Sequence, residues 1–302
     1  MSKQVQRSIQ LKDNTSLTIT IFPTNNPNDP VLVLYPAFGV KATYYARFAQ
    51  QLNEVGIKVV TADLRGHGLS SVRPGSTNNY GFLEMISDLK AISDTLKVAF
   101  PKQKIYLLGH SLGGQVASLM VAKYPTAYDG LAMIGAPNVY YKGWSGFHYY
   151  RRKVGLYLLP FIGRIVDLLP KFKIGGYYTT QTQMQEWGYT GKTGNYKVVG
   201  DNFNYEQAME QVVIPVLAID IEGDLMAPKV AIANLHQKFK STSNLTVLTL
   251  TKAATQATLS HINWPRTADK MMVKIIRNWI MQFKRSQRSD RPENRDCQKS
   301  DL

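Results

Sequence analysis

Residues 104–123 read Lys104-Ile-Tyr-Leu-Leu-Gly-His-Ser-Leu-Gly-Gly-Gln-Val-Ala-Ser-Leu-Met-Val-Ala-Lys123. The apolar run from Ile105 to Leu108 predicts a buried strand, and the periodic apolar residues after Gly113 predict a helix. Between them, residues 109–113 fit the pattern Gly-x-Ser-x-Gly, which in a strand-turn-helix context exposes the serine hydroxyl above a sheet edge. Glycine on both sides of Ser111 removes Cβ atoms that would collide in so sharp a turn. A glycine-rich helix start capped by a serine is the alternative interpretation.

Strands and helices alternate through most of the remaining chain. This alternation predicts an α/β fold with a mostly parallel central sheet flanked by helices on both faces. Ligands of such sheets bind beyond the carboxyl ends of the strands, where Ser111 is expected. The predicted strands cover residues 16–22, 31–35, 57–62, 105–108, 131–135, 214–220 and 245–250. The predicted amphipathic helices cover residues 43–55, 83–100 and 268–283, besides the one after the serine.

One long segment interrupts the alternation. Residues 138–211 are rich in tyrosine and tryptophan and carry a basic cluster that includes Arg151, Arg152 and Lys153. We interpret this segment as a cap inserted into a core of residues 1–137 and 212–283, followed by a disordered polar tail at 284–302. The most apolar part, Val154 to Pro170, is too short and too often interrupted to span a membrane. We interpret this apolar stretch as the hydrophobic core of the cap, with two alternatives: a lining for an acyl chain, or a face that docks on a membrane.

The composition is that of a globular protein with a strongly basic balance. The chain has 302 residues, 44% hydrophobic and 19% charged, with a formal net charge of +15. This surplus indicates a solvated, anion-attracting surface, and peripheral contact with an anionic membrane is the alternative. No nucleic-acid-binding motif is found. The polar start lacks a signal-peptide pattern, and Cys297 is the only cysteine, so we expect a reducing, cytoplasmic location.

A serine hydroxyl needs a base, and the base needs an acid that holds it. His261 is the favoured base, because it follows the last predicted strand and precedes the final helix, at the sheet's carboxyl rim. The other histidines are expected to serve packing, loop, cap or helix-surface roles. They are His67, His110, His148 and His236.

The acid is expected between the serine and the histidine in chain order. Three acids follow the predicted strand that begins at Ile214. Asp224 is favoured because it lies in the loop beyond the strand, after flexible Gly223, with Glu222 next and Asp220 still within the strand.

Negative charge that develops on the carbonyl oxygen requires two backbone N–H donors. Leu112, directly after the serine, supplies one of them. Phe38, in the loop after the strand at residues 31–35, supplies the other, because Pro36 has no N–H and Ala37 comes one residue too early.

Five segments together resemble the α/β-hydrolase superfamily. These segments are Tyr35-Pro-Ala-Phe-Gly-Val40, Asp63-Leu-Arg-Gly-His-Gly-Leu-Ser70, Gly109-His-Ser-Leu-Gly-Gly114, Glu222-Gly-Asp-Leu-Met-Ala-Pro228 and Ser260-His-Ile-Asn-Trp264. The chain is most similar to the branch of monoacylglycerol lipases, lysophospholipases and serine aminopeptidase-like hydrolases. The resemblance implies Ser111 as nucleophile, Asp224 as acid, His261 as base, and Phe38 and Leu112 as oxyanion donors. It covers about residues 10–283, with one departure: Pro36-Ala37 stands where family members often have His-Gly.

The leading hypothesis is a serine hydrolase that cleaves a carboxylic ester with an apolar acyl group, such as a lipid-like ester. An aminopeptidase or amidase is the second, and a free substrate amine would then bind Glu186 or Glu206. A non-catalytic relative that serves as a binding protein is the third. No His-Glu-x-x-His or Cys-x-x-Cys motif is present, so neither metal nor cofactor is predicted.

Overall fold

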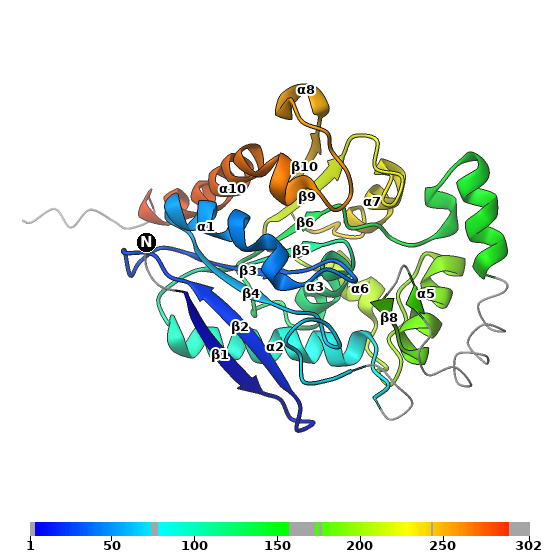
Figure 1. Cartoon of the computed structure of the whole chain (residues 1–302), viewed down its shortest axis with the longest axis horizontal. Helices are drawn as coiled ribbons and strands as arrows, with labels where there is room; N and C mark the ends of the chain where they lie inside the picture. Colours follow the sequence, from blue (N-terminus) through cyan, green and yellow to red (C-terminus); the bar gives the residue numbers. More distant parts are fainter. Residues whose placement is uncertain (1–3, 74–77, 157–172, 175–176, 243, 290–302) are drawn as a thin grey trace, which may run out of the picture.

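The computed structural model describes residues 4–73, 78–156, 173–174, 177–242 and 244–289 (Figure 1). At its centre is an eight-stranded sheet with the order β1-β2-β4-β3-β5-β6-β9-β10. The strands from β4 to β10 are parallel, whereas β1 and β2 pair in antiparallel fashion. The mostly parallel sheet predicted from the sequence is therefore confirmed. Its strands are β1 (Val5–Gln10), β2 (Ser16–Phe22), β3 (Val31–Tyr35), β4 (Lys58–Ala62), β5 (Ile105–His110), β6 (Gly130–Ile134), β9 (Val216–Ile221) and β10 (Leu245–Leu250).

The central strands are buried on both faces. Every residue of β3, Val31-Leu-Val-Leu-Tyr35, is inaccessible to solvent. A strand covered on one face only would alternate apolar and polar residues, so a continuous apolar run fits two covering layers.

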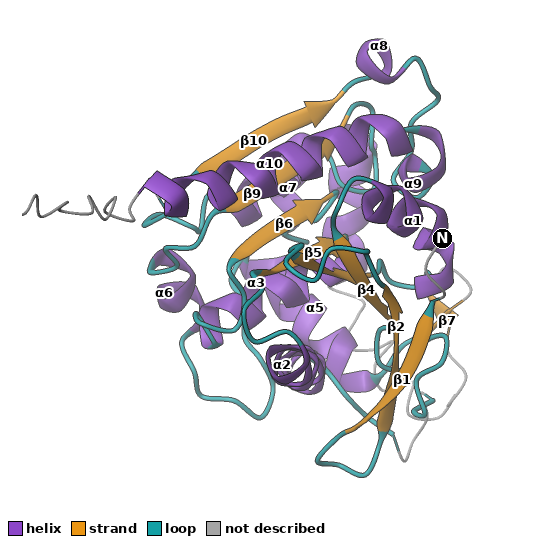
Figure 2. Ribbon diagram, turned by 90° about the vertical axis from the view of Figure 1, so that its left-hand side faces the viewer, coloured by secondary structure: helices purple, strands orange, loops and turns teal. Residues whose placement is uncertain are grey.

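Helices form those two layers, one on each face of the sheet (Figure 2). On one face lie α2 (Phe82–Ala99), α3 (Leu112–Lys123) and α7 (Lys229–His236). On the other lie α1 (Ala46–Glu54), α9 (Trp264–Thr267) and α10 (Asp269–Ser289), with Trp264 and Trp279 as large buried side chains. A 3₁₀ turn, η1 (Ala42–Tyr45), leads into α1, and α8 (Lys252–Thr255) follows β10.

The segment between β6 and β9 carries its own short elements. Helical residues 146–156 and α5 lie together at one end of the molecule, green in Figure 1. Tyr196, Tyr205 and Met209 join the same core cluster as α2 and α3. Most of the apolar stretch from Val154 to Pro170 lies outside the described residues. The elements are η2 (Tyr141–Gly143), residues 146–156, β7 (Lys173–Ile174), β8 (Tyr177–Tyr178), α5 (Gln181–Thr193) and α6 (Tyr205–Glu210).

The two ends of the chain differ from the sequence-based expectation. The sequence does not predict β1, because all of its side chains except Ile9 are exposed and give no apolar pattern. The final helix continues through Ser289 rather than ending at Phe283. Lysine, arginine and glutamine favour helix, and positive charge suits a helix C-terminus. The rest of the expected tail, residues 290–302, lies outside the described residues.

Candidate active site

Ser111 occupies a strained turn between β5 and α3. Its φ is 52°, a value that residues other than glycine rarely adopt. A Cβ at Gly109 would lie 2.4 Å from the carbonyl oxygen of Gly113. A Cβ at Gly113 would lie 2.3 Å from that of Tyr35. The predicted need for glycine on both sides of the serine is thus confirmed.

His261 connects Ser111 to Asp224 through two hydrogen bonds. Its Nε2 lies 2.8 Å from Ser111 Oγ, and its Nδ1 lies 2.6 Å from Asp224 Oδ2. Both His261 and Asp224 are buried. With the carboxylate accepting from Nδ1–H, Nε2 is left to accept the serine proton. The arrangement can therefore move a proton away from the serine hydroxyl.

The loop after β9 orients Asp224 and separates it from the other candidate acids. Gly223 turns the chain with a φ of +76°. Oδ1 of Asp224 then accepts the N–H groups of Met226 and Ala227, at 2.8 and 3.0 Å, which leaves Oδ2 to face His261. Glu222 is exposed and accepts the N–H of Lys252, and Asp220 accepts from the Thr249 hydroxyl. Of the three acids, Asp224 is the one that contacts the histidine.

The other histidines lie where the sequence interpretation placed them. His110 is fully buried beneath His261, with ring centroids 5.1 Å apart. Nδ1 of His67 lies 3.0 Å from the carbonyl oxygen of Arg65, within its own loop. His148 belongs to helical residues 146–156, and His236 ends α7.

A buried polar chain below the site was not foreseen from the sequence. Trp264 Nε1 donates to His110 Nε2 at 3.3 Å, so the His110 proton resides on Nδ1 and is donated to the Tyr45 hydroxyl at 2.6 Å. Burial lowers the pKa of His110 well below its ordinary value and keeps the ring neutral. The Tyr45 hydroxyl also accepts the N–H of Ala37 at 3.3 Å. These hydrogen bonds connect His110, which lies below His261, to the loop after β3.

This contact bears on the oxyanion donors. Pro36 has no N–H, and the N–H of Ala37 is directed to Tyr45, so Phe38 is the next residue of the loop that carries an N–H. Leu112 is the first residue of α3, where backbone N–H groups lack intrahelical partners. Both residues line one cavity together with Ser111 and His261.

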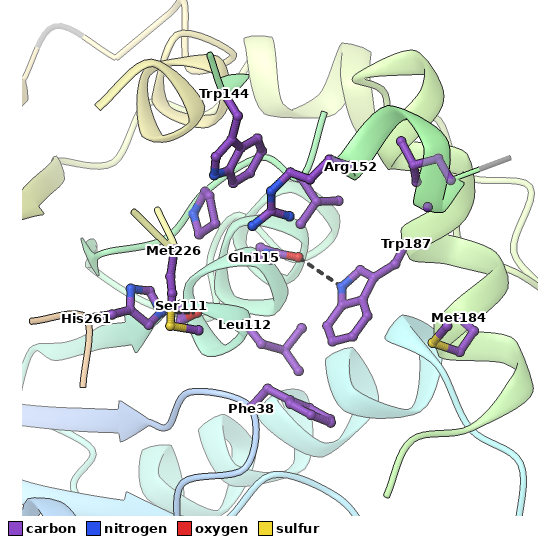
Figure 3. A pocket seen from close by; sticks show the side chains of 14 residues that line it. Phe38, Ser111, Leu112, Gln115, Trp144, Arg152, Met184, Trp187, Met226 and His261 are labelled. Atoms are coloured by element: carbon purple, nitrogen blue, oxygen red, sulfur yellow. Dashed lines mark hydrogen bonds between the residues drawn. The ribbon is translucent and has the colours of Figure 1, made fainter. Parts of the chain in front are cut away.

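That cavity has a volume of about 440 Å³ and is mostly apolar. Figure 3 shows Ser111 and His261 at one side and the side chains of the segment between β6 and β9 opposite them. Trp187 Nε1 donates to Gln115 Oε1 at 3.3 Å and joins the two walls. The lining residues are Phe38, Ser111, Leu112, Gln115, Pro137, Val139, Trp144, Arg152, Gly155, Leu156, Met184, Trp187, Met226 and His261.

The family model described as serine aminopeptidase, S33 (Hydrolase_4) matches residues 26–178, just over half of the chain. The chain belongs to this family. Its resemblance to the α/β-hydrolases, stated above from five motifs, is thereby confirmed.

Individual relatives and structures agree with the family. The sn-1-specific diacylglycerol lipase ABHD11 of Danio rerio is 27% identical over 143 residues, 47% of this chain and 43% of the relative. Monoglyceride lipase of Rattus norvegicus is 30% identical over 112 residues, 37% of this chain and 36% of the relative. The chain therefore spans less than half the length of these relatives. The structure of Est1E from Butyrivibrio proteoclasticus superposes with a TM-score of 0.61 at 17% identity, covering 92% of this chain and 98% of that one, and shows the same fold.

The two acids expected to bind a free amine in an aminopeptidase, Glu186 and Glu206, are not among the residues that line the cavity. Glu186 on α5 accepts the N–H groups of Phe82 and Val199, and burial raises its pKa to about 7. Glu206 pairs with Lys238 and accepts the N–H of Tyr196. Both carboxylates are occupied by contacts within the fold.

No metal centre is evident in the part of the chain that the structure describes. Histidine, cysteine and carboxylate side chains do not gather there in groups of three or more with metal-binding geometry.

Proposed function

We propose that the chain is a serine hydrolase that cleaves a carboxylic ester through an acyl-enzyme intermediate. The observation that carries the proposal is the hydrogen-bond chain from Ser111 Oγ through His261 to Asp224, with both distances below 3 Å. A serine so placed, at the floor of an apolar cavity, has the base that its chemistry requires.

Ser111 Oγ attacks the ester carbonyl while His261 Nε2 takes its proton. Asp224 holds the ring through Nδ1 and stabilises the imidazolium that forms. The N–H groups of Leu112 and Phe38 bind the oxyanion of the tetrahedral intermediate. His261 then protonates the leaving alcohol, and a water activated by the same nitrogen releases the acid from Ser111.

The proposed substrate is an ester with an apolar, lipid-like acyl group. A cavity of about 440 Å³ lies in the range of small-molecule sites, and its walls carry side chains such as Leu156, Met184 and Trp187. The relatives named above are a diacylglycerol lipase and a monoglyceride lipase. Their names support this substrate class for the present chain.

We also propose that residues 138–211 act as a cap on a core of residues 1–137 and 212–283. Trp144, Arg152 and Trp187 of this segment line the cavity above Ser111. A hydrogen bond from Phe82 N to Glu186 Oε2, at 2.8 Å, holds α5 against the start of α2. Cap residues thus shape the substrate site, while the reacting groups belong to the core.

Contact with an anionic membrane is a further part of the proposal. Phe147, Tyr150 and Val154 form a stripe along helical residues 146–156 and are more than half exposed, and basic Arg151 lies beside them. Apolar and basic side chains on one helix favour an anionic lipid surface. None of the helices in the described part of the chain combines a membrane-spanning length with sufficient hydropathy. A cytoplasmic location stays a prediction.

The second candidate, an aminopeptidase or amidase, is favoured by the description of the family. The contacts of Glu186 and Glu206 count against it, because neither carboxylate is left to receive an amine. The third candidate, a non-catalytic binding protein, does not explain the strained φ of Ser111 or its hydrogen bond to His261, because backbone strain of this kind is typical of functional sites.

Labelling with a fluorophosphonate probe tests the proposed function. We expect the unaltered protein and the control Ser87→Ala, which changes an exposed serine on α2, to be labelled equally. Ser111→Ala should not be labelled. An unlabelled native protein, or equal labelling of Ser111→Ala, would refute the assignment. A panel of esters of increasing acyl length then tests the apolar site, and equal rates from acetyl to long chains would contradict it.

A further inference from the structure

Among the described residues that line the cavity above Ser111, Arg152 is the one cationic side chain. Its guanidinium carbon lies 3.6 Å from the centre of the Trp144 ring, and Figure 3 shows the group directed into the cavity. Trp144 is itself fixed, because it is buried and its Nε1 donates to the carbonyl oxygen of Leu225 at 3.0 Å. The arginine is therefore held at a defined place in the cavity wall.

No anion of the chain neutralises this arginine in the part that the structure describes. No carboxylate there lies within ion-pair distance of Arg152, and its buried Nε has no hydrogen-bond acceptor. Arg65, which is buried, has two acidic partners: it pairs with both Asp88 and Asp13 at 2.5 Å. Half-buried Arg152 differs, because its guanidinium is directed into the cavity and has no acidic partner among the described residues.

An arginine in this position stays charged near neutral pH at a cost in free energy. Burial and the neighbouring Arg151 lower the pKa of Arg152 to about 10, which still leaves the guanidinium protonated at pH 7. Stacking on Trp144 offsets part of the lost hydration. A buried donor without an acceptor remains unfavourable until an acceptor arrives.

We propose that Arg152 binds an anionic group of the ester substrate, a carboxylate or a phosphate remote from the scissile carbonyl. The planar guanidinium matches both groups, because each can accept two parallel N–H bonds. The remaining cavity wall is mostly apolar, so the part of the substrate between the carbonyl and the anion is expected to be apolar or compact. The inference rests on the proposed function and narrows its substrate class to anionic esters.

Two series of matched esters test the proposal and distinguish where the anion lies. In the acyl series, the mono-4-nitrophenyl esters of adipate, suberate and sebacate are compared with neutral 4-nitrophenyl esters of equal chain length. In the alcohol series, 1-hexanoylglycerol 3-phosphate is compared with 1-hexanoylglycerol. The readout is the ratio of kcat/KM for the anionic and the neutral ester within each variant, so a general loss of activity cancels.

We expect the unaltered protein to prefer the anionic ester by about 10- to 100-fold in one of the two series, as for one charge-assisted hydrogen-bond pair. Arg152→Gln should bring that ratio to about 1, and Arg152→Lys should retain part of it because the charge is kept. Arg151→Gln is the matched control: it removes an exposed charge next in sequence and should keep the full ratio. Fluorophosphonate labelling of Ser111 in every variant establishes that the site is folded.

The outcomes separate this proposal from the proposed function. If neutral esters are hydrolysed but neither series shows an anionic preference, the role of Arg152 is refuted and the hydrolase stands. The same conclusion follows if Arg152→Gln keeps the preference or if Arg151→Gln loses it equally. If no ester of either series is hydrolysed and Ser111 is not labelled, the proposed function itself fails.

Discussion

Replacing Asp224 with asparagine keeps the shape of the side chain and removes its charge. The amide oxygen of the asparagine is expected to take the place of Oδ1, which now accepts from Met226 and Ala227. The reverse orientation would direct an NH₂ group at two backbone donors and lose both hydrogen bonds, at about 1–3 kcal/mol each. The NH₂ group must therefore face His261 Nδ1.

This orientation reverses the tautomer of His261. Nδ1 becomes an acceptor, the proton moves to Nε2, and Nε2 can no longer take the proton of Ser111, now 2.8 Å away. In serine proteases the same change lowers kcat by about 10⁴-fold, which corresponds to about 5 kcal/mol in the activation barrier. We expect a similar loss of kcat/KM for 4-nitrophenyl esters, with the thermal midpoint little changed.

Glu222→Gln is the control for this experiment, because Glu222 lies on the same loop, is exposed and does not contact the histidine. It should hydrolyse esters within about twofold of the unaltered protein, as expected for a surface substitution. An Asp224→Asn variant that keeps more than a tenth of the activity would show that Asp224 does not set the tautomer of His261.

Three other substitutions have defined outcomes. Gly113→Ala forces a methyl group to within 2.3 Å of a backbone oxygen and should cost about 2 kcal/mol or more in the free energy of unfolding by denaturant. Gly155→Ala, whose added methyl has no atom of the described residues within 4 Å, should cost nothing. Equal stability of the two variants would contradict the crowding. Tyr45→Phe leaves the buried N–H of Ala37 without its acceptor, so we expect a loss of about 1–3 kcal/mol in the free energy of unfolding and a lower kcat at unchanged KM. A normal kcat would show that Tyr45 does not position the loop that carries Phe38. The pKa of Glu186, raised from 4.5 to about 7, means that the folded chain binds more protons than the unfolded chain between these pH values. The contribution of Glu186 to the free energy of unfolding is complete below about pH 4.5 and is lost as the pH rises through 7, up to about 3 kcal/mol. Glu186→Gln should therefore weaken the pH dependence of the urea midpoint between pH 5 and pH 8. An unchanged pH dependence would refute this role.

The parts of the fold that the sequence predicts are those with local signals. The fully buried strand β3 is a continuous apolar run, and Gly109 and Gly113 mark a turn whose crowding is local. Chain order then indicated His261 and Asp224, because the carboxyl ends of parallel strands meet at one edge.

The features that escaped prediction depend on contacts between distant segments. Tyr45 has the pattern of an ordinary apolar helix residue, yet its hydroxyl accepts from His110, 65 residues away. Arg152 looked like one member of a basic surface cluster, and only its stacking on Trp144 directs it into the cavity. Strand β1 lacks an apolar pattern because its place at the sheet edge leaves it exposed.

The three residues of the hydrogen-bond chain come from widely separated parts of the sequence. His261 is 150 residues from Ser111 and 37 from Asp224, and it follows β10, the strand at one edge of the sheet. Long-range contacts of this kind form late, because the chain must close large loops before it gains them. The reactivity of Ser111 toward a fluorophosphonate therefore reports on a late step of folding. During refolding, labelling should appear only when the last strands have joined the sheet, after the circular dichroism signal of the helices has recovered.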